Sequence, residues 1–257
     1  MHIKNFIKSA IIISTMITIP QASASLLYDQ NISPDVIMGS GVTNGGFTTD
    51  QYTLIDTQGI LENIELGLRA KLRHDPANGF APQNTYNSNG DGTYSFNSGQ
   101  TINASTGEWS FEWSINTGPL MLADYTFFLS MVGPNDNEGF DVINVPCADH
   151  SLGNMFTGNG AGSEVDCTSA TANIDYTAAI LSNSVAQNSW KPNWFLPNFD
   201  PNMDGTYTFA LSAFDFSGRE VAKTEISVLV GDTTQVPEPA SLILLALGLF
   251  GLRTKKA

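Results

Sequence analysis

The chain has 257 residues, of which 42% are hydrophobic, so it can bury a sizeable core. Its 25 Asp and Glu residues outnumber its 11 Lys and Arg residues and give a formal net charge of −14. A surface of this charge repels nucleic acid and anionic lipid, which excludes functions that depend on a broad basic face. Solubility and divalent-cation binding stay open as roles for the acidic residues.

The start of the chain has the order of a secretory signal peptide, which we assign to residues 1–24. A basic start, an apolar run and a cleavage site of small residues follow one another: Lys4 and Lys8, residues 10–19, and Ala22 and Ala24. We therefore predict export, with signal peptidase as a partner and cleavage after Ala24.

The body of the protein, residues 25–232, is dominated by patterns of period two. Between Asn63 and Arg73, apolar residues alternate with charged or small ones, which predicts a strand with one buried and one solvated face. Residues Trp109–Ile115 alternate in the same way with aromatic side chains. A further strand is expected at Tyr125–Met131.

Two more strands are predicted late in the body, at Tyr207–Ala213 and Glu225–Val230, joined by a turn near Ser217 and Gly218. A helix pattern occurs only at Tyr176–Ala186. Clusters of Gly, Asn, Asp and Pro between the periodic segments predict long loops. The expected fold is all-β: an antiparallel β-sandwich of immunoglobulin-like or jelly-roll type.

One short pattern occurs twice, at Asp91–Phe96 and Asp204–Phe209, and each copy begins Asp-Gly-Thr-Tyr. Residues 204–218 resemble the late strands of bacterial immunoglobulin-like modules. The resemblance implies a corner role for Tyr207, in which its hydroxyl bonds back to the backbone. No activity follows from this resemblance.

The two cysteines, Cys147 and Cys167, both lie in the exported body. An oxidising compartment favours a disulfide between them, and closing this loop would contribute on the order of 3 kcal/mol. The alternative is a pair of free thiols in a metal site, for which His150 is the isolated histidine nearby. We predict the disulfide.

Asp200, Asn202 and Asp204 begin like a calcium-binding loop, with oxygen ligands at alternate positions. An EF-hand loop needs a Glu at its twelfth position, and Leu211 stands there. A turn in which Asp and Asn bond to the backbone accounts for the same residues and is favoured, with Ca²⁺ as the alternative. The acidic loop at residues 135–141 has the same two interpretations.

Arg69, Lys71 and Arg73 share the polar face of the strand at 63–73 and supply half of the positive charge of the body. They suit contacts with an anionic polysaccharide, or pairing with acidic residues on a neighbouring strand, which we favour. Four tryptophans pose a choice between a sugar-stacking platform and core packing, and core packing is favoured. These are Trp109, Trp113, Trp190 and Trp194.

The sequence contains no G-x-S-x-G elbow, no H-E-x-x-H zinc motif, no Cys/His nucleophile pair and no phosphate-binding loop. A glycosidase needs only two carboxylates, but nothing selects a pair among the 24 acidic residues of the body. We therefore assign no catalytic residue and expect no enzymatic activity.

The last part of the sequence combines a kinked spacer, an apolar run and basic residues. The linker 233–239 contains Val236, Pro237, Glu238 and Pro239. Residues 240–252 are apolar on all sides and are predicted to form a helix of roughly 20 Å, short for a bilayer core of ~30 Å. The basic stop, which would stay in the cytoplasm, is residues 253–257 with Arg253, Lys255 and Lys256.

This order resembles the PEP-CTERM sorting signal, although Thr254 interrupts its closing basic run. The resemblance implies processing by exosortase, a membrane-embedded, transpeptidase-like enzyme of Gram-negative bacteria that make exopolysaccharide, at Pro237, Glu238 and Pro239. It also implies a transient anchor in the inner membrane, followed by release to the cell surface or extracellular matrix.

Three functions are consistent with the sequence. The leading hypothesis is a non-catalytic structural or interaction role in the cell envelope or exopolysaccharide matrix. The second is a carbohydrate-binding module, with or without calcium, and the third is a secreted polysaccharide-processing enzyme. A solvent-exposed Trp platform or a concave groove would favour the second, and two carboxylates about 5–9 Å apart in a cleft would favour the third. A closed convex surface with its aromatic residues buried would favour the first.

Overall fold

The computed structural model describes residues 26–32, 37, 39–55, 61–81 and 85–231. The predicted signal peptide and the C-terminal linker, helix and basic stop lie outside these residues. Among the residues that are described, no helix has the length and apolar character needed to cross a membrane.

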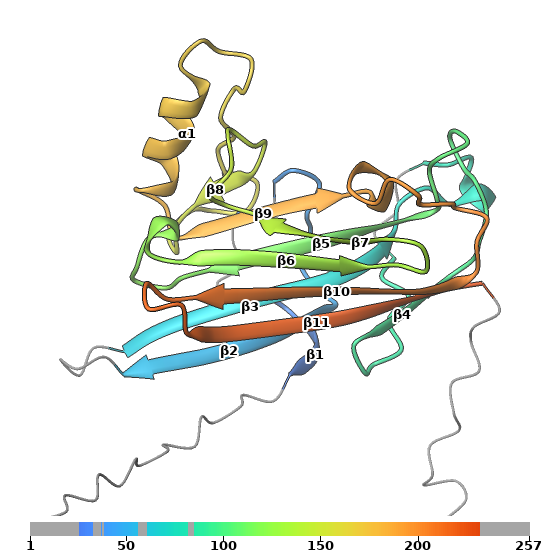
Figure 1. The fold of residues 1–257 in the computed structure, drawn as a ribbon, viewed down its shortest axis with the longest axis horizontal. Coiled ribbons are helices and arrows are strands. Elements are labelled where there is room, and N and C mark those ends of the chain that lie inside the picture. Colours follow the sequence, from blue (N-terminus) through green and yellow to red (C-terminus); the bar gives the residue numbers. More distant parts are fainter. Residues whose placement is uncertain (1–25, 33–36, 38, 56–60, 82–84, 232–257) are drawn as a thin grey trace, which may run out of the picture.

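Two β-sheets face each other and form the body of the molecule (Figure 1). The first sheet has, in spatial order, β1 (Leu27–Gln30), β2 (Phe47–Ile55), β3 (Leu61–Leu72), β5 (Trp109–Asn116), β9 (Val185–Trp190) and β8 (Ser151–Gly153). The second sheet has β4 (Thr93–Phe96), β11 (Glu220–Val230), β10 (Gly205–Phe214), β6 (Thr126–Val132) and β7 (Asn137–Asp141). The all-β sandwich is therefore confirmed, whereas its immunoglobulin-like or jelly-roll type stays a prediction.

The expectation of a wholly antiparallel sandwich is wrong at one strand pair. β4 runs parallel to β11, with Tyr94 beside Val228. The two strands are far apart in the sequence, so no hairpin turn dictates their relative direction. The other strand pairs in the described part of the chain are antiparallel.

Aromatic side chains from both sheets fill the space between them. Phe111 of β5 stacks on Phe209 of β10, with ring centroids 4.4 Å apart. The rings of Trp109 and Tyr207 are 5.3 Å apart between centroids. Both tyrosines of the repeated pattern, Tyr94 and Tyr207, are buried. The hydroxyl of Tyr94 donates to the carbonyl of Gly46, 2.8 Å away, and links β4 to the residue that precedes β2 of the opposite sheet.

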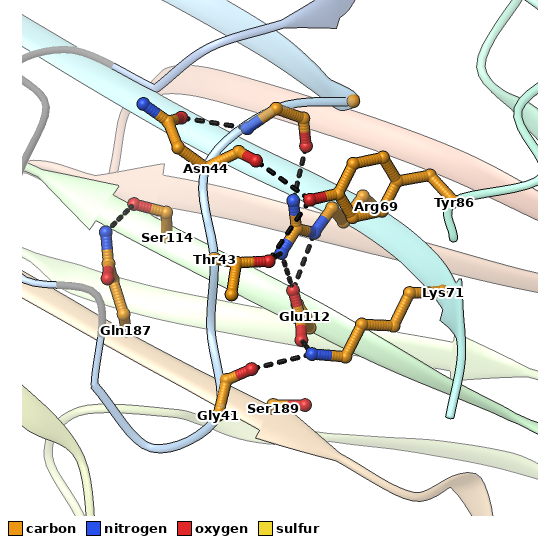
Figure 2. A network of polar contacts seen from close by, with 12 residues as sticks. Gly41, Thr43, Asn44, Arg69, Lys71, Tyr86, Glu112, Ser114, Gln187 and Ser189 are labelled. Atoms are coloured by element: carbon orange, nitrogen blue, oxygen red, sulfur yellow. Dashed lines mark hydrogen bonds and ion pairs between the residues drawn. The ribbon is translucent and has the colours of Figure 1, made fainter. Parts of the chain in front are cut away.

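The predicted solvated face of β3 is buried, which corrects the sequence analysis. Arg69 and Glu112, on the outer faces of β3 and β5, are both fully buried. Residues 39–46, which we call the strap, cross this outer face and cover it (Figure 2). The alternating pattern correctly predicted a strand. Its polar face, however, is covered by the strap instead of being exposed to solvent.

The α-helix found in the described residues, α1, spans Ala172–Ile180 instead of the predicted Tyr176–Ala186. Asn183 ends it by donating from its side chain to the carbonyl of Ala179. The residues from Val185 onward then pair with β5 as strand β9, and this tertiary pairing overrides their helical pattern. In the part of the chain that the structure describes, three short 3-10 helices occur in loops: η1 (Pro76–Asn78), η2 (Leu122–Asp124) and η3 (Pro192–Trp194).

Candidate functional site

The predicted disulfide joins Cys147 to Cys167. It closes the loop that contains β8, beside α1 at one edge of the first sheet (Figure 1). The strap is attached to this loop, because the hydroxyl of Ser40 lies 2.9 Å from the carbonyl of Asp149 and 2.7 Å from the carboxylate of Glu164. The covalent link therefore stiffens the chain that holds the strap in place.

A groove of about 480 Å³ opens next to the disulfide. Most of its lining is apolar or aromatic: Phe140, Val142, Val145, Cys147, Ala148, Asp149, His150, Cys167, Trp190, Trp194 and Phe195. These residues come from β7, from the loops that precede and follow β8, and from the end of β9 with the turn that follows it. Its size and lining are typical of a small-ligand site.

The wall of the groove is built from stacked rings. Phe195 lies 4.6 Å from Trp190 and 5.3 Å from Phe140, measured between ring centroids. Trp190 is buried, whereas 54% of Trp194 is exposed. The ammonium of Lys191 lies over the Trp194 ring, 5.7 Å from its centroid, so the exposed indole has a cation on one side.

The four tryptophans therefore divide between two roles. Trp109, Trp113 and Trp190 are buried in the core, as the sequence analysis favoured. Trp194 is exposed at the groove, where a ligand can reach it. Nothing in the local sequence separates Trp194 from Trp190, because the difference arises where β9 ends and the 3-10 helix η3 turns the chain outward.

His150 forms part of the groove lining but is fully buried itself. Burial lowers its pKa to about 4, against the smaller opposing effects of the Val142 carbonyl and Asp149. The ring is therefore neutral near pH 7, and its two nitrogens have distinct partners. Nε2 donates to the carbonyl of Val142 at 2.7 Å, and Nδ1 accepts from the side-chain amide of Asn188 at 3.1 Å. His150 thus fixes the shape of the groove.

Arg69, Lys71 and Glu112 form a buried ion-pair network under the strap (Figure 2). The Arg69 guanidinium donates from Nε to one Glu112 oxygen at 2.6 Å and from Nη2 to the same oxygen. The Lys71 ammonium pairs with the other Glu112 oxygen and donates to the carbonyl of Gly41 at 2.6 Å. The pairing of these cations with a cross-strand acid is confirmed.

Two aromatic rings complete the surroundings of Arg69. The guanidinium carbon lies 4.3 Å from the centroid of Phe47 and 4.2 Å from that of Tyr86. The Tyr86 hydroxyl donates to the carbonyl of Asn44 in the strap, 2.8 Å away. The sequence did not predict that Tyr86 contacts Arg69, because Tyr86 lies in a separate loop that has no periodic pattern.

Arg73 is separate from this network, although the sequence placed it with Arg69 and Lys71. Its Nη1 donates to the hydroxyl of Ser189 at 3.2 Å. Within the described residues, no carboxylate forms an ion pair with Arg73. The three cations on one strand face therefore have two different roles.

The predicted calcium ligands lie in a turn. One oxygen of Asp200 accepts hydrogen bonds from the backbone amide of Asn202 at 2.9 Å and from its side-chain amide at 3.0 Å. Asp204 lines a separate polar pocket of about 450 Å³. In the second acidic loop, Asp136 accepts hydrogen bonds from Asn198. No group of three or more His, Cys, Asp or Glu residues suited to a metal occurs in the described part of the chain.

The sorting residues Val236, Pro237, Glu238 and Pro239, the basic residues Arg253, Lys255 and Lys256, and the cleavage residues Ala22 and Ala24 lie outside the described residues. Comparison of the chain with curated proteins and with solved structures gives no match. A family model described as the PEP-CTERM protein-sorting motif matches residues 235–256. This match confirms the resemblance predicted from Val236–Pro239: the chain carries the PEP-CTERM protein-sorting motif, which supports an exported protein sorted by exosortase.

Proposed function

We propose that this protein has a non-catalytic structural or interaction role in the cell envelope or exopolysaccharide matrix of a Gram-negative bacterium. The observation that carries this proposal is the buried network of Arg69, Lys71 and Glu112. These charges bind one another and the strap, and they are sealed from solvent. They strengthen a single folded state instead of presenting reactive groups to a substrate.

The groove beside the disulfide supports the same proposal. Asp149 is the one carboxylate among its described lining residues, whereas glycoside hydrolysis uses two. The buried His150 has both ring nitrogens bound and is neutral near pH 7. A polysaccharide-processing enzyme, the third hypothesis, therefore has less support. Release of reducing ends from acidic and neutral polysaccharides by the purified protein would overturn the non-catalytic proposal.

Substitution of the sorting motif tests delivery to the envelope. Replacing Pro237, Glu238 and Pro239 by alanine in the native host should leave the tail uncleaved and hold the protein in the inner membrane. Immunoblots of membrane, surface and matrix fractions measure the outcome. A control variant changes Pro192, in the body, to alanine. A motif variant with unchanged size and location would contradict exosortase processing.

Carbohydrate binding is the second candidate function, and the exposed Trp194 at the mouth of the groove favours it. An indole face packs against the apolar C–H face of a sugar ring. Screening the protein against a panel of immobilised glycans tests this function, and binding to none of them would remove it.

Calcium assistance at Asp200, Asn202 and Asp204 belongs to this second candidate. One Asp200 oxygen already accepts two hydrogen bonds within the turn. Repeating the glycan screen and a thermal melt with Ca²⁺ and with a chelator tests it. Equal binding and equal melting temperatures would exclude a calcium-dependent version.

A further inference from the structure

The six basic residues of the body divide into paired and unpaired groups. Four form ion pairs with carboxylates: Arg69 and Lys71 with Glu112, Arg219 with Asp215, and Lys223 with Glu225. Arg73 and Lys191 form none with the residues that the structure describes. In a body with 24 acidic residues, two cations left without a carboxylate stand out as available to an external anion.

Arg73 and Lys191 lie at the same end of the first sheet. Arg73 directly follows β3 and donates to Ser189, which precedes Lys191 by two residues at the end of β9. Lys191 follows the last residue of β9 and keeps an extended backbone, with φ −87° and ψ 139°, so it lies about 7 Å from Ser189. Burial and then the charge of Arg73 lower the pKa of Lys191, as expected when two cations lie near each other without an anion between them.

Two side-chain nitrogens near these cations also lack partners. Nε of Arg73 and Nε2 of His74 are buried and have no hydrogen-bond partner among the described residues. Burial lowers the pKa of His74, and the charges of Lys191 and Arg73 lower it further. Nδ1 of the neutral His74 ring donates to the Phe80 carbonyl at 3.2 Å, which leaves Nε2 without a proton. This end of the sheet therefore offers an anion the charges of Arg73 and Lys191, and no donor from His74.

We propose that Arg73, Lys191 and Trp194 form a subsite for a sugar that carries a carboxylate, as in a uronic-acid polysaccharide. The sugar ring stacks on the exposed face of Trp194, and carboxylates of this ring and its neighbour pair with Lys191 and Arg73. This assignment rests on the second candidate function, carbohydrate binding. It adds to that function the charge of the ligand and the residues that recognise the charge.

The acidic body sets the conditions under which such binding is measured. A long polyanion is repelled by the remaining surface, whereas a trisaccharide contacts the cationic end alone. Salt at 0.1 M limits the repulsion to a range of ~10 Å. A uronate trisaccharide at moderate ionic strength is therefore the better probe.

Isothermal titration of the full-length chain with a uronate trisaccharide tests the proposal. Lys191→Gln and Arg73→Gln should each weaken binding about three- to fivefold, and Trp194→Ala about tenfold. The matched control is Lys223→Gln, which removes the same charge from an exposed pair on the second sheet. It should bind like the unchanged protein, and thermal melts should show that all four variants fold.

The same trisaccharide with its carboxylates reduced to alcohols separates this inference from carbohydrate binding in general. Weaker binding of the reduced sugar supports the uronate subsite. Equal binding overturns the uronate subsite but leaves carbohydrate binding intact. No binding of either sugar overturns both. An acidic peptide that binds as tightly as the uronate, with the same loss in Lys191→Gln, would show an anion site without preference for sugar and would also overturn the proposal.

Discussion

Arg69 of β3 and Glu112 of β5 are directly opposite each other in the first sheet, and both are fully buried. Because the two residues are paired across the strands, the Arg69 guanidinium can donate twice to one carboxylate oxygen of Glu112. Lys71 pairs with the other oxygen. Such a network is costly to desolvate and depends on every member being present. Its integrity therefore links the strap, the two central strands and the loop that carries Tyr86.

Removing the anion should strongly destabilise the protein. Glu112→Gln keeps the side-chain volume but leaves Arg69 and Lys71 buried without a counter-charge, and we expect a loss of about 3–5 kcal/mol in the free energy of unfolding. Chemical denaturation measures the loss. Glu225→Gln, which breaks an exposed pair with Lys223, should cost less than about 1 kcal/mol. Equal effects of the two substitutions would contradict a structural role for the network.

Gly46 should be less replaceable than Gly79, although both have a positive φ, +68° and +66°. A Cβ at Gly46 would lie 2.7 Å from Cδ2 of Tyr86, whereas a Cβ at Gly79 meets nothing within 4 Å. Gly79→Ala should therefore lower the free energy of unfolding by roughly 1–2 kcal/mol, through backbone strain alone. Gly46→Ala should lose about 1–3 kcal/mol more, because it displaces the ring that covers Arg69. Denaturation midpoints that fall together for the two variants would argue against this contact.

The disulfide should stabilise the body by constraining its unfolded state. Cys147 and Cys167 are 20 residues apart, and replacing both by serine should lower the free energy of unfolding by on the order of 3 kcal/mol. Ser40→Ala removes the hydrogen bonds from the strap to the disulfide loop and should cost about 1 kcal/mol. Thermal melts under oxidising conditions compare the variants. A double serine variant as stable as the parent would show that the loop needs no cross-link.

Stability should fall in acid because of His150. Its pKa is about 4 in the folded protein and 6.5 when unperturbed, so the unfolded chain takes up a proton first as the pH falls. Neutral His150 contributes about 3 kcal/mol to the free energy of unfolding. This contribution is fully present above pH 6.5 and is lost as the pH falls to 4.

The variant His150→Gln isolates this effect. Glutamine keeps a donor for the Val142 carbonyl but does not titrate, so the difference in unfolding free energy between parent and variant should shrink from pH 7 to pH 4. Burial raises the pKa values of Asp50 and Glu108, which gives the opposite pH dependence, but both groups are present in the two proteins and cancel. A difference that stays constant over this range would exclude His150 as the source.

Local patterns were sufficient for some of the strands, such as β3 and β5, and for the sorting motif. Alternation at residues 63–73 and 109–115 located β3 and β5, because a strand that faces a core must place apolar side chains on one side. The motif at Val236–Pro239 was recognisable because it is a contiguous signal. The two cysteines predicted their own disulfide, since the exported body contains no other candidate.

The candidate site could not be predicted in the same way, since its residues meet only in the folded chain. Trp190 and Trp194 are four positions apart, yet one is buried and the other is exposed. Arg69 and Arg73 share a strand face in the sequence, but only Arg69 lies opposite an acid. The residues that decide these differences, such as Ser189 and Tyr86, come from distant segments.

The sequence by itself determined the sorting motif of this protein, its all-β class and its cross-link, because each depends on residues that are adjacent or few. Tertiary structure decided which charges are sealed and which are available. The strap covers the outer face of the first sheet and buries Arg69, Lys71 and Glu112. Arg73 and Lys191 lie at the end of this sheet, where Arg73 bonds to Ser189 and Lys191 lies over Trp194. Burial and charge pairing depend on long-range contacts, and a periodic pattern contains no information about them.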